Sequence, residues 1–219
     1  MARKKASSFE HQRGAIHEVA ARLFAEQGFH NASMMELAVA CGISKPLLYH
    51  YFRDKEEILF EIVDTYIDRL LGVCKGVEAE RLPPEAALRR LVTLFMEEYE
   101  HSQSRHRVLV QDVKFLPADV RELVEAKQRQ VVDAFARQLS GIAPELDQAS
   151  LTKPVTMILF GMINWTFTWL RSDGRLTYGD MAPMVVELFL NGVKALGRCP
   201  GGLPSRGRAG TQTEDDQLV

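Results

Sequence analysis

The stretch GISKPLLYHYFRDKEE, residues 42–57, concentrates side chains that can bind a polymer or a ligand. Four rings stand in a row at residues 49–52, close behind Lys45 and Leu47. Tyrosine hydroxyls and imidazole N–H groups can bond phosphate oxygens, and a leucine can contact a thymine methyl group. A short helix buries only one of its faces, so some of these rings must face outward. The segment therefore has the chemistry to grip a phosphate backbone and to read a few base edges.

Two short helices joined by a tight turn are predicted around this segment. Ser33 and Glu36 have the spacing of a capping box and open a helix over 33–41, whereas Ser44 caps another over 44–52. A helix of about 8 residues is about 12 Å long, which is about the width of the DNA major groove. These are the dimensions of a helix-turn-helix, whose second helix enters that groove.

The side chains of this second helix are predicted to divide between two faces. Leu48 and Phe52 are four residues apart and should pack on the two preceding helices. The outward set is predicted to be Lys45, Leu47, Tyr49, His50 and Tyr51. Lys55, in the first turn of the next helix, adds a positive charge beside N–H groups that favour an anion. Packing on a neighbouring domain or a dimer mate is the alternative for any single ring, but the whole set favours DNA.

The charge distribution agrees with a polyanion as partner. The chain has 219 residues, a net charge of −2, 46% hydrophobic residues and 26% charged residues. Residues 1–55 carry 8 Lys/Arg and 5 Asp/Glu, a net charge of +3, which leaves −5 on the remainder. A positive N-terminal part on a negative body suits a segment that meets nucleic acid. The three cysteines form no CxxC pair, and no apolar stretch follows the basic N-terminus, which together indicate a cytoplasmic protein.

Helical periodicity extends over almost the whole chain, and no strand or repeat is predicted. Further helices are expected before Gly28 and from Asp54 toward Cys74. Three more should begin after Pro83, Pro117 and Pro154, and a last one should cover 178–196. The predicted fold class is all-α. We expect a helix-turn-helix DNA-binding domain at 1–55, ordered from about residue 9, an effector-binding and dimerisation domain at 56–196, and a disordered Gly- and Pro-rich tail at 197–219.

The most apolar stretch, residues 154–170, runs without a charged side chain. A membrane span needs about 20 such residues, and this run is shorter and contains polar residues. We therefore expect no membrane association but a buried helix that packs on its own domain and on a second copy of the chain. With the last helix it would form a four-helix dimer interface. The predicted interface residues are Ile163, Phe167, Val185, Leu188 and Phe189.

The same region could hold a small molecule. Polar atoms among large rings are typical of a ligand pocket, although rings and methionines at helical spacing are more often plain core residues. The candidate ligand-binding residues are Phe95, Met96, Tyr99, Arg107, Lys114, Phe115, Asn164, Trp165, Thr168 and Trp169.

An enzyme is one alternative. Glu98 and His101 form an E-x-x-H, the spacing used in di-iron helix bundles, but those sites need a second such motif. No hydrolase elbow, phosphate-binding loop or HExxH motif occurs either. We therefore expect no catalytic residue, no metal and no cofactor. The other alternative is a helical bundle that binds protein partners.

Residues 28–59, GFHNASMMELAVACGISKPLLYHYFRDKEEIL, resemble the N-terminal domain of the TetR family of bacterial repressors, and the likeness extends over roughly residues 14–63. The resemblance implies an all-helical homodimer that binds a palindromic double-stranded DNA operator and is released by a small-molecule effector. The matching positions that the family uses on DNA are Ser33, Ser44, Lys45, Pro46, Leu47, Tyr49, His50, Tyr51 and Lys55. Pro46 and the His50-Tyr51 order depart from the common pattern, which affects the preferred bases.

Residues 164–193 also resemble TetR-family members that sense acyl-CoA thioesters, including regulators of fatty-acid and phenylacetate degradation. This second resemblance implies an acyl-CoA or aryl-CoA effector with its acyl or aryl group buried in the helical bundle. It places the CoA phosphates near basic side chains, for which the candidates are Arg105, Arg107 and Lys114, or Arg121, Lys127 and Arg129.

Overall fold

The computed structural model describes residues 2–171 and 174–196, so the predicted tail at 197–219 lies outside the described residues. Within the described part the chain forms α-helices and two 3-10 helices and contains no strand, which confirms the all-α prediction. The α-helices are α1 (Ala2–Gln27), α2 (Met34–Ala40), α3 (Lys45–Tyr51), α4 (Lys55–Ala79), α5 (Pro84–His101), α6 (Gln103–Gln111), α7 (Ala118–Ile142), α8 (Glu145–Gln148), α9 (Thr152–Asn164) and α10 (Tyr178–Leu196). The 3-10 helices are η1 (Val113–Phe115) and η2 (Trp165–Thr168).

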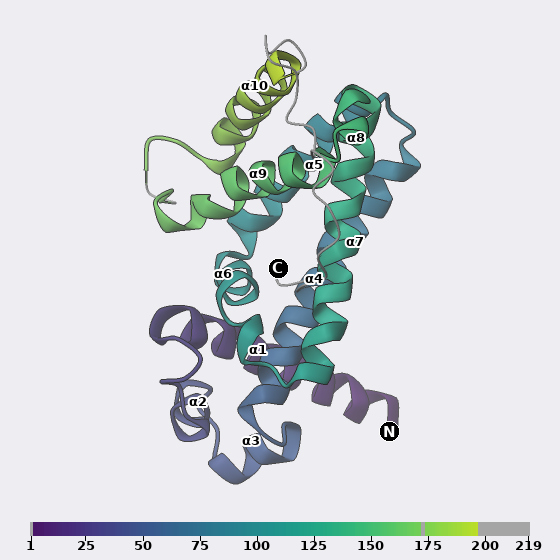
Figure 1. Ribbon diagram of the computed structural model, residues 1–219. Helices are drawn as coiled ribbons and strands as arrows, with labels where there is room; N and C mark the ends of the chain where they lie inside the picture. Colours follow the sequence, from purple (N-terminus) through teal and green to yellow (C-terminus); the bar gives the residue numbers. More distant parts are fainter. Residues whose placement is uncertain (1, 172–173, 197–219) are drawn as a thin grey trace, which may run out of the picture.

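Helices α1–α3 form one end of the molecule, and we call them the head; α4–α10 form the body (Figure 1). The core of the head is built from fully buried side chains of α1, α2 and α3, among them Phe24, Leu37 and Leu48. Helix α1 begins at Ala2, ahead of the predicted start of order near residue 9. Its exposed and buried positions follow the 3.6-residue period that the sequence predicts.

Two glycines end the first two helices, as their positions predict. Gly28 and Gly42 have φ values of 84° and 65°, in the left-handed region that glycine adopts without strain. The backbone N–H of Ile43 donates to the carbonyl oxygen of Ala38 at 3.0 Å, which closes α2 in a Schellman motif. This tight closure allows α3 to begin directly after the turn.

Serine side chains fix the starts of α2 and α3. The Ser33 hydroxyl accepts from the Glu36 N–H at 3.2 Å, and the Glu36 carboxylate accepts from the Ser33 N–H at 2.8 Å, so the predicted capping box is present. The Ser44 hydroxyl accepts from the Leu47 N–H at 3.3 Å. These caps satisfy N–H groups that have no partner within their own helices.

Asp54 and Glu57 have the spacing of a capping box at the start of α4, but the box forms only in part. Asp54 accepts from the Glu57 N–H at 2.8 Å, as expected of an N-cap. The Glu57 carboxylate, however, accepts from the N–H of Arg53 at 2.7 Å rather than from that of Asp54. Asp54 therefore caps the start of α4, while the Glu57 carboxylate holds the backbone just before the helix at Arg53.

The body is a bundle in which α4 packs on α5, α6 and α7, while α5 also packs on α7 and α10. The long helices α4 and α7 run beside each other away from the head (Figure 1). Three phenylalanine rings occupy the body core: the Phe135 centroid lies 4.9 Å from that of Phe95 and 4.8 Å from that of Phe160. Among the described residues, no helix has the length and the apolar character needed to cross a membrane.

Two differences from the sequence-based expectation affect the interior of the body. Helix α6 (Gln103–Gln111) was not expected, because its sequence QSRHRVLVQ has few apolar residues to reveal a period. The apolar run was expected as one helix, but α9 ends at Asn164 and the chain tightens into the 3-10 helix η2. Both differences change which side chains lie in the interior.

Candidate nucleic-acid interface

Helix α3 lies at the far end of the head and turns one face outward (Figure 1). Leu48 and Phe52 are buried in the head core, as their spacing predicts. On the opposite side, Leu47 is 41% exposed and Tyr49 is 47% exposed. It is the grouping of these side chains on one face of a capped helix that indicates a contact surface.

The other side chains predicted for this face differ in their exposure to solvent. The Lys45 ammonium lies 5.9 Å from the centre of the Tyr49 ring, so the two share a flank of the helix. His50 is exposed. The Tyr51 ring is only half-buried but packs against Phe9 of α1, with 4.7 Å between ring centroids. The exposed face of α3 therefore consists mainly of Lys45, Leu47, Tyr49 and His50.

The two serines and Pro46 sit at helix starts. Ser33 and Ser44 are exposed, and each uses its hydroxyl oxygen as a hydrogen-bond acceptor within its cap. A hydroxyl that accepts in a cap can still donate its own hydrogen to an outside oxygen. Pro46 lies in the first turn of α3, where no intrahelical N–H bond is lost, and it is exposed.

Lys55 takes a position that differs from the free cation expected from the sequence. Its ammonium donates to the carbonyl oxygens of Phe29, His30 and Ala32 at 3.0, 3.3 and 3.2 Å, and it lies 4.4 Å from the centre of the Phe29 ring. An ammonium has three donors, and all three are used within the protein. Lys55 thus joins the start of α4 to the loop that precedes α2, instead of projecting toward an outside anion.

The predicted ligand-binding residues occupy separate places. Phe95, Met96 and Tyr99 are buried in the body, and the Tyr99 hydroxyl donates to the Asn164 side-chain oxygen at 2.8 Å. The Phe95 ring lies 6.0 Å from the Tyr99 ring, centroid to centroid, so side chains of α5 and α9 meet here. We call Phe95, Met96, Tyr99 and Asn164, together with the Tyr66 and His106 side chains described next, the interior cluster.

Two residues of the interior cluster were missed by the sequence reasoning. The His106 ring stacks on that of Tyr99 with 3.7 Å between centroids, and Tyr66 of α4 lies edge-on to His106 at 6.2 Å. Among the described residues, the two ring nitrogens of His106 have no hydrogen-bond partner of normal geometry. The same is true of the Tyr66 hydroxyl. The sequence predicts no helix around His106, so it does not place this ring beside that of Tyr99.

Burial controls the protonation of these groups. Burial lowers the pKa of His106 to about 4, against the smaller opposing effect of the Asn164 backbone. Burial likewise raises the pKa of Tyr66 and of Tyr99. At neutral pH the cluster is therefore uncharged and offers hydrogen-bonding groups in an apolar surrounding.

Three predicted ligand-binding residues lie on the outside. Trp165 is 66% exposed, Trp169 is 49% exposed, and Thr168 is exposed as well. They were expected beside Asn164 on a continuous helix, but η2 rotates them away from the body core. These three residues do not line the interior cluster.

The remaining candidates lie where the head meets the body. Phe115 of η1 stacks on Phe29 with 5.8 Å between centroids, and Lys114 beside it is exposed. Arg107 of α6 donates to the carbonyl oxygen of Ala25 at 3.1 Å. These side chains connect the two parts of the molecule rather than contributing to the interior cluster.

The predicted dimer residues also require correction. Ile163, Val185 and Phe189 are buried in the core of their own chain, where a partner cannot reach them, and Phe167 is half-buried against His106. Of the five, only Leu188 faces outward, with 70% exposure. The apolar side chains that α9, η2 and α10 do expose are Met157, Ile158, Trp165, Met184 and Leu188.

The E-x-x-H motif does not gather further metal ligands. His101 Nδ1 lies 2.6 Å from the carbonyl oxygen of Glu97 on the preceding turn. In the described ranges, 2–171 and 174–196, no three His, Cys, Asp or Glu side chains come together as a metal site would require.

Comparisons with known proteins agree with this geometry. Residues 16–62 match the bacterial regulatory proteins of the tetR family, and residues 81–193 match the tetracyclin repressor-like C-terminal domain. The HTH-type transcriptional repressor KstR2 of Rhodococcus jostii (strain RHA1) is 34% identical over 110 residues, which are 50% of this chain and 54% of that protein. The chain thus matches about half the length of that relative.

Two solved structures are similar over most of the chain. A TetR-family transcriptional regulator from Bordetella parapertussis 12822 has a TM-score of 0.79 and 38% identity over 82% of this chain and 94% of that one. AibR in complex with isovaleryl coenzyme A and operator DNA has a TM-score of 0.70 and 27% identity over 81% and 97%. With its head and body both matched, the chain belongs to the TetR family of bacterial regulatory proteins.

Proposed function

We propose that this protein is a transcriptional repressor that binds a palindromic operator as a dimer and leaves it when a small effector binds. The observation that carries the proposal is the outward face of α3, where Lys45, Leu47 and Tyr49 are exposed although Leu48 between them is buried. A lysine and a tyrosine hydroxyl suit phosphate oxygens, and the leucine suits a thymine methyl group.

In this proposal α3 is the recognition helix. It is seven residues long, and its start is fixed by the Ser44 cap and the Gly42 turn. The hydroxyls of Ser33 and Ser44 and the backbone at Pro46 lie at helix starts, where N–H groups favour phosphate. Tyr51 and Lys55 support this face from behind, through Phe9 and the loop at 29–32 respectively.

We assign the dimer interface to the exposed apolar face of α9, η2 and α10. Met157, Ile158 and Leu188 are 47%, 59% and 70% exposed, more than water favours for side chains of this kind at neighbouring positions. A palindrome requires a twofold dimer whose two heads reach its two half-sites, and we propose this face for the twofold contact.

The interior cluster is the proposed effector site. Buried polar groups without a partner cost about 1–3 kcal/mol each, so Tyr66 and His106 lower the energy of a state in which a ligand supplies the missing hydrogen bonds. Because both are uncharged at neutral pH, they suit a neutral carbonyl or amide better than a carboxylate. Phe95, Phe135 and Phe160 provide the apolar surface around such a group.

Helix α6 offers a route from the effector to the head. His106 faces the interior cluster, whereas its neighbours Arg105 and Arg107 contact Glu18 and the Ala25 carbonyl of α1. In this proposal an entering ligand displaces the His106 ring from its place on Tyr99, and with it α6. The head then shifts, and the population moves away from the DNA-competent arrangement by no more than the ligand's differential affinity.

For the effector we favour an acyl-CoA or aryl-CoA thioester, whose carbonyl would meet His106 or Tyr66. The isovaleryl coenzyme A bound to the similar AibR supports this class. The test is a gel shift with DNA from upstream of the protein's own gene, to which a panel of CoA thioesters is added. Release of the DNA, accompanied by a raised melting temperature, supports the class; a panel that does neither contradicts it.

A further inference from the structure

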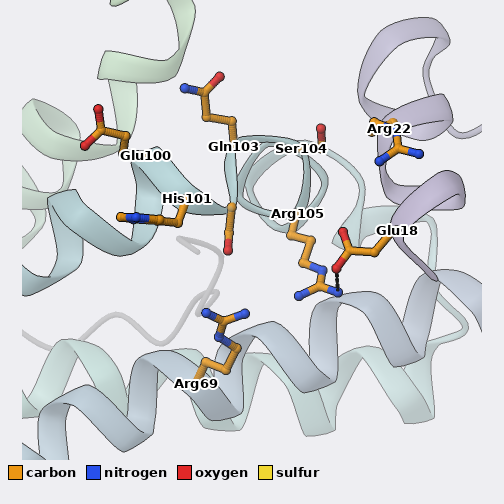
Figure 2. A pocket seen from close by; sticks show the side chains of 9 residues that line it. Glu18, Arg22, Arg69, Glu100, His101, Gln103, Ser104 and Arg105 are labelled. Carbon is orange, nitrogen blue, oxygen red and sulfur yellow. Dashed lines mark hydrogen bonds and ion pairs between the residues drawn. The ribbon is translucent and has the colours of Figure 1, made fainter. Parts of the chain in front are cut away.

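A cleft lies between the head and the body, and none of its lining residues belongs to α3 or to the interior cluster (Figure 2). Its walls are α1, α4, the end of α5 and the start of α6, and its volume is about 450 Å³. That volume is in the range of small-molecule sites. The charged residues that line it are Glu18, Arg22, Arg69, Glu100 and Arg105.

Two guanidinium groups dominate this cleft. Arg69 of α4 and Arg105 of α6 extend into it from opposite walls (Figure 2). Each has one carboxylate partner, at 2.6 Å from Arg69 to Glu98 and at 2.5 Å from Arg105 to Glu18. A guanidinium has five N–H donors, so both retain donors for a further acceptor. Like charges that face one space repel each other, and an anion between them removes that repulsion.

The surrounding side chains add to the positive potential. Arg22 lies one turn after Glu18 on α1 and has no ion pair among the described residues. Two carboxylates, those of Glu18 and Glu100, also line the cleft, but the three arginines outnumber them. The planar fork of arginine matches the oxygens of phosphate, which carry more charge than one carboxylate.

We propose that this cleft binds a phosphate-bearing small molecule whose oxyanion lies between Arg69 and Arg105. The anion replaces Glu18 on Arg105: the Glu18 side chain is 56% exposed and can turn into water, whereas Arg105 is only 17% exposed and stays in place. Replacing Glu18 breaks an ion pair that joins α6 to α1. On the proposed function, the phosphate group therefore acts together with the interior cluster to loosen the head.

The test is a calorimetric titration of the full chain with inorganic pyrophosphate at constant ionic strength. Arg69→Gln and Arg105→Gln should each weaken binding by about ten-fold, because each removes a charge-assisted contact. Glu18→Gln should strengthen binding by about three-fold or more, because it removes the competing carboxylate. Arg137→Gln, an exposed arginine of α7 outside the cleft, is the matched control and should leave the affinity unchanged.

The pair Arg105→Gln and Glu18→Gln separates binding from stability, since both break the same ion pair but should change the affinity in opposite directions. Absence of saturable pyrophosphate binding, or a change in the same direction for both variants, overturns the proposal. A parallel titration with adenosine diphosphate identifies the source of the phosphates. If it binds more tightly than pyrophosphate, the ligand is a nucleotide; if the two bind equally, the ligand is the free anion. DNA binding by Arg69→Gln without any added anion tests the proposed function separately.

Discussion

The Lys55 ammonium lies over the Phe29 ring at 4.4 Å and donates to three carbonyl oxygens of the loop that follows α1. A single side chain thus holds together the start of α4 and the segment that leads into α2. The head can present α3 in a fixed orientation only if this junction is rigid. Lys55 and Lys45, both lysines of the same short region, consequently have different roles.

Replacing each of these two lysines should distinguish a role in the stability of the head from a role in DNA binding. Lys55→Met leaves three carbonyls without their donor and should lower the free energy of unfolding by about 2 kcal/mol. Lys45→Met should leave stability nearly unchanged, because the side chain is exposed, but it should weaken binding to all DNA and reduce the salt dependence by about one phosphate contact. Urea unfolding and gel shifts at several salt concentrations measure both effects. Equal destabilisation by the two variants would contradict this division.

Leu47 and Tyr49 should differ in what they contribute on DNA. Leu47→Ala should alter sequence preference, since an apolar contact with a base costs about 1–3 kcal/mol at one position when lost. Tyr49→Phe, which removes only the hydroxyl, should weaken specific and random DNA alike. Competition gel shifts with operator and random duplexes give the ratio directly. If Leu47→Ala weakens the affinity for both duplexes by the same factor, Leu47 does not read a base.

His106 should make stability depend on pH. The unfolded ring has a pKa of 6.5 and the folded ring a pKa of about 4, because burial disfavours the charged form. As pH falls from about 7 to 4, the unfolded state takes up a proton first, so the free energy of unfolding falls by up to about 3 kcal/mol. Above pH 7 the group contributes no pH dependence.

The measurement is urea unfolding of the wild type and of His106→Leu between pH 4 and pH 8. Asp112 changes stability in the opposite sense, since burial raises its pKa to about 6, so the comparison is the difference between the two proteins. His11→Gln, an exposed position on α1, is the control and should follow the wild type. Parallel curves for the wild type and His106→Leu would show that the ring is not buried in its neutral form.

The dimer assignment predicts a selective effect of charge. Leu188→Glu should shift the protein toward monomer, because it puts a carboxylate in the centre of the proposed interface. Leu123→Glu makes the same change on α7, at a side chain that is 57% exposed and is not part of the proposed interface, and should remain dimeric. Sedimentation velocity distinguishes the two species. A Leu188→Glu variant that stays dimeric would place the interface elsewhere.

The head could be predicted from the sequence because its signals are local. The Ser33 capping box, the Gly42 turn and the four-residue spacing of Leu48 and Phe52 each involve neighbours along the chain. Local geometry of this kind fixes helix boundaries and faces without knowledge of distant residues. The bounds of α2 and α3 accordingly agree with expectation within a residue or two.

The body was less predictable because its contacts join distant segments. The place of His106 beside Tyr99 depends on how α6 packs on α4 and α5, and the sequence of α6 has no clear apolar period. The outward position of Trp165 depends on the change from α9 to η2, and no residue type in the sequence predicts that change. Lys55 was misplaced for the same reason, since its partners lie 23–26 residues earlier in the chain.

The most direct test of the central claim is selection of bound duplexes from a randomised DNA pool, carried out with the wild type and with a Lys45→Met, Leu47→Ala, Tyr49→Phe triple variant. We expect the wild type to enrich an inverted repeat whose half-sites are about one helical turn apart, with binding that weakens steeply as salt rises. The triple variant, with all three changes at exposed positions of α3, should remain folded and enrich nothing. Enrichment of the same repeat by the triple variant, or of no sequence by the wild type, would contradict the assignment of α3 as the DNA-reading element.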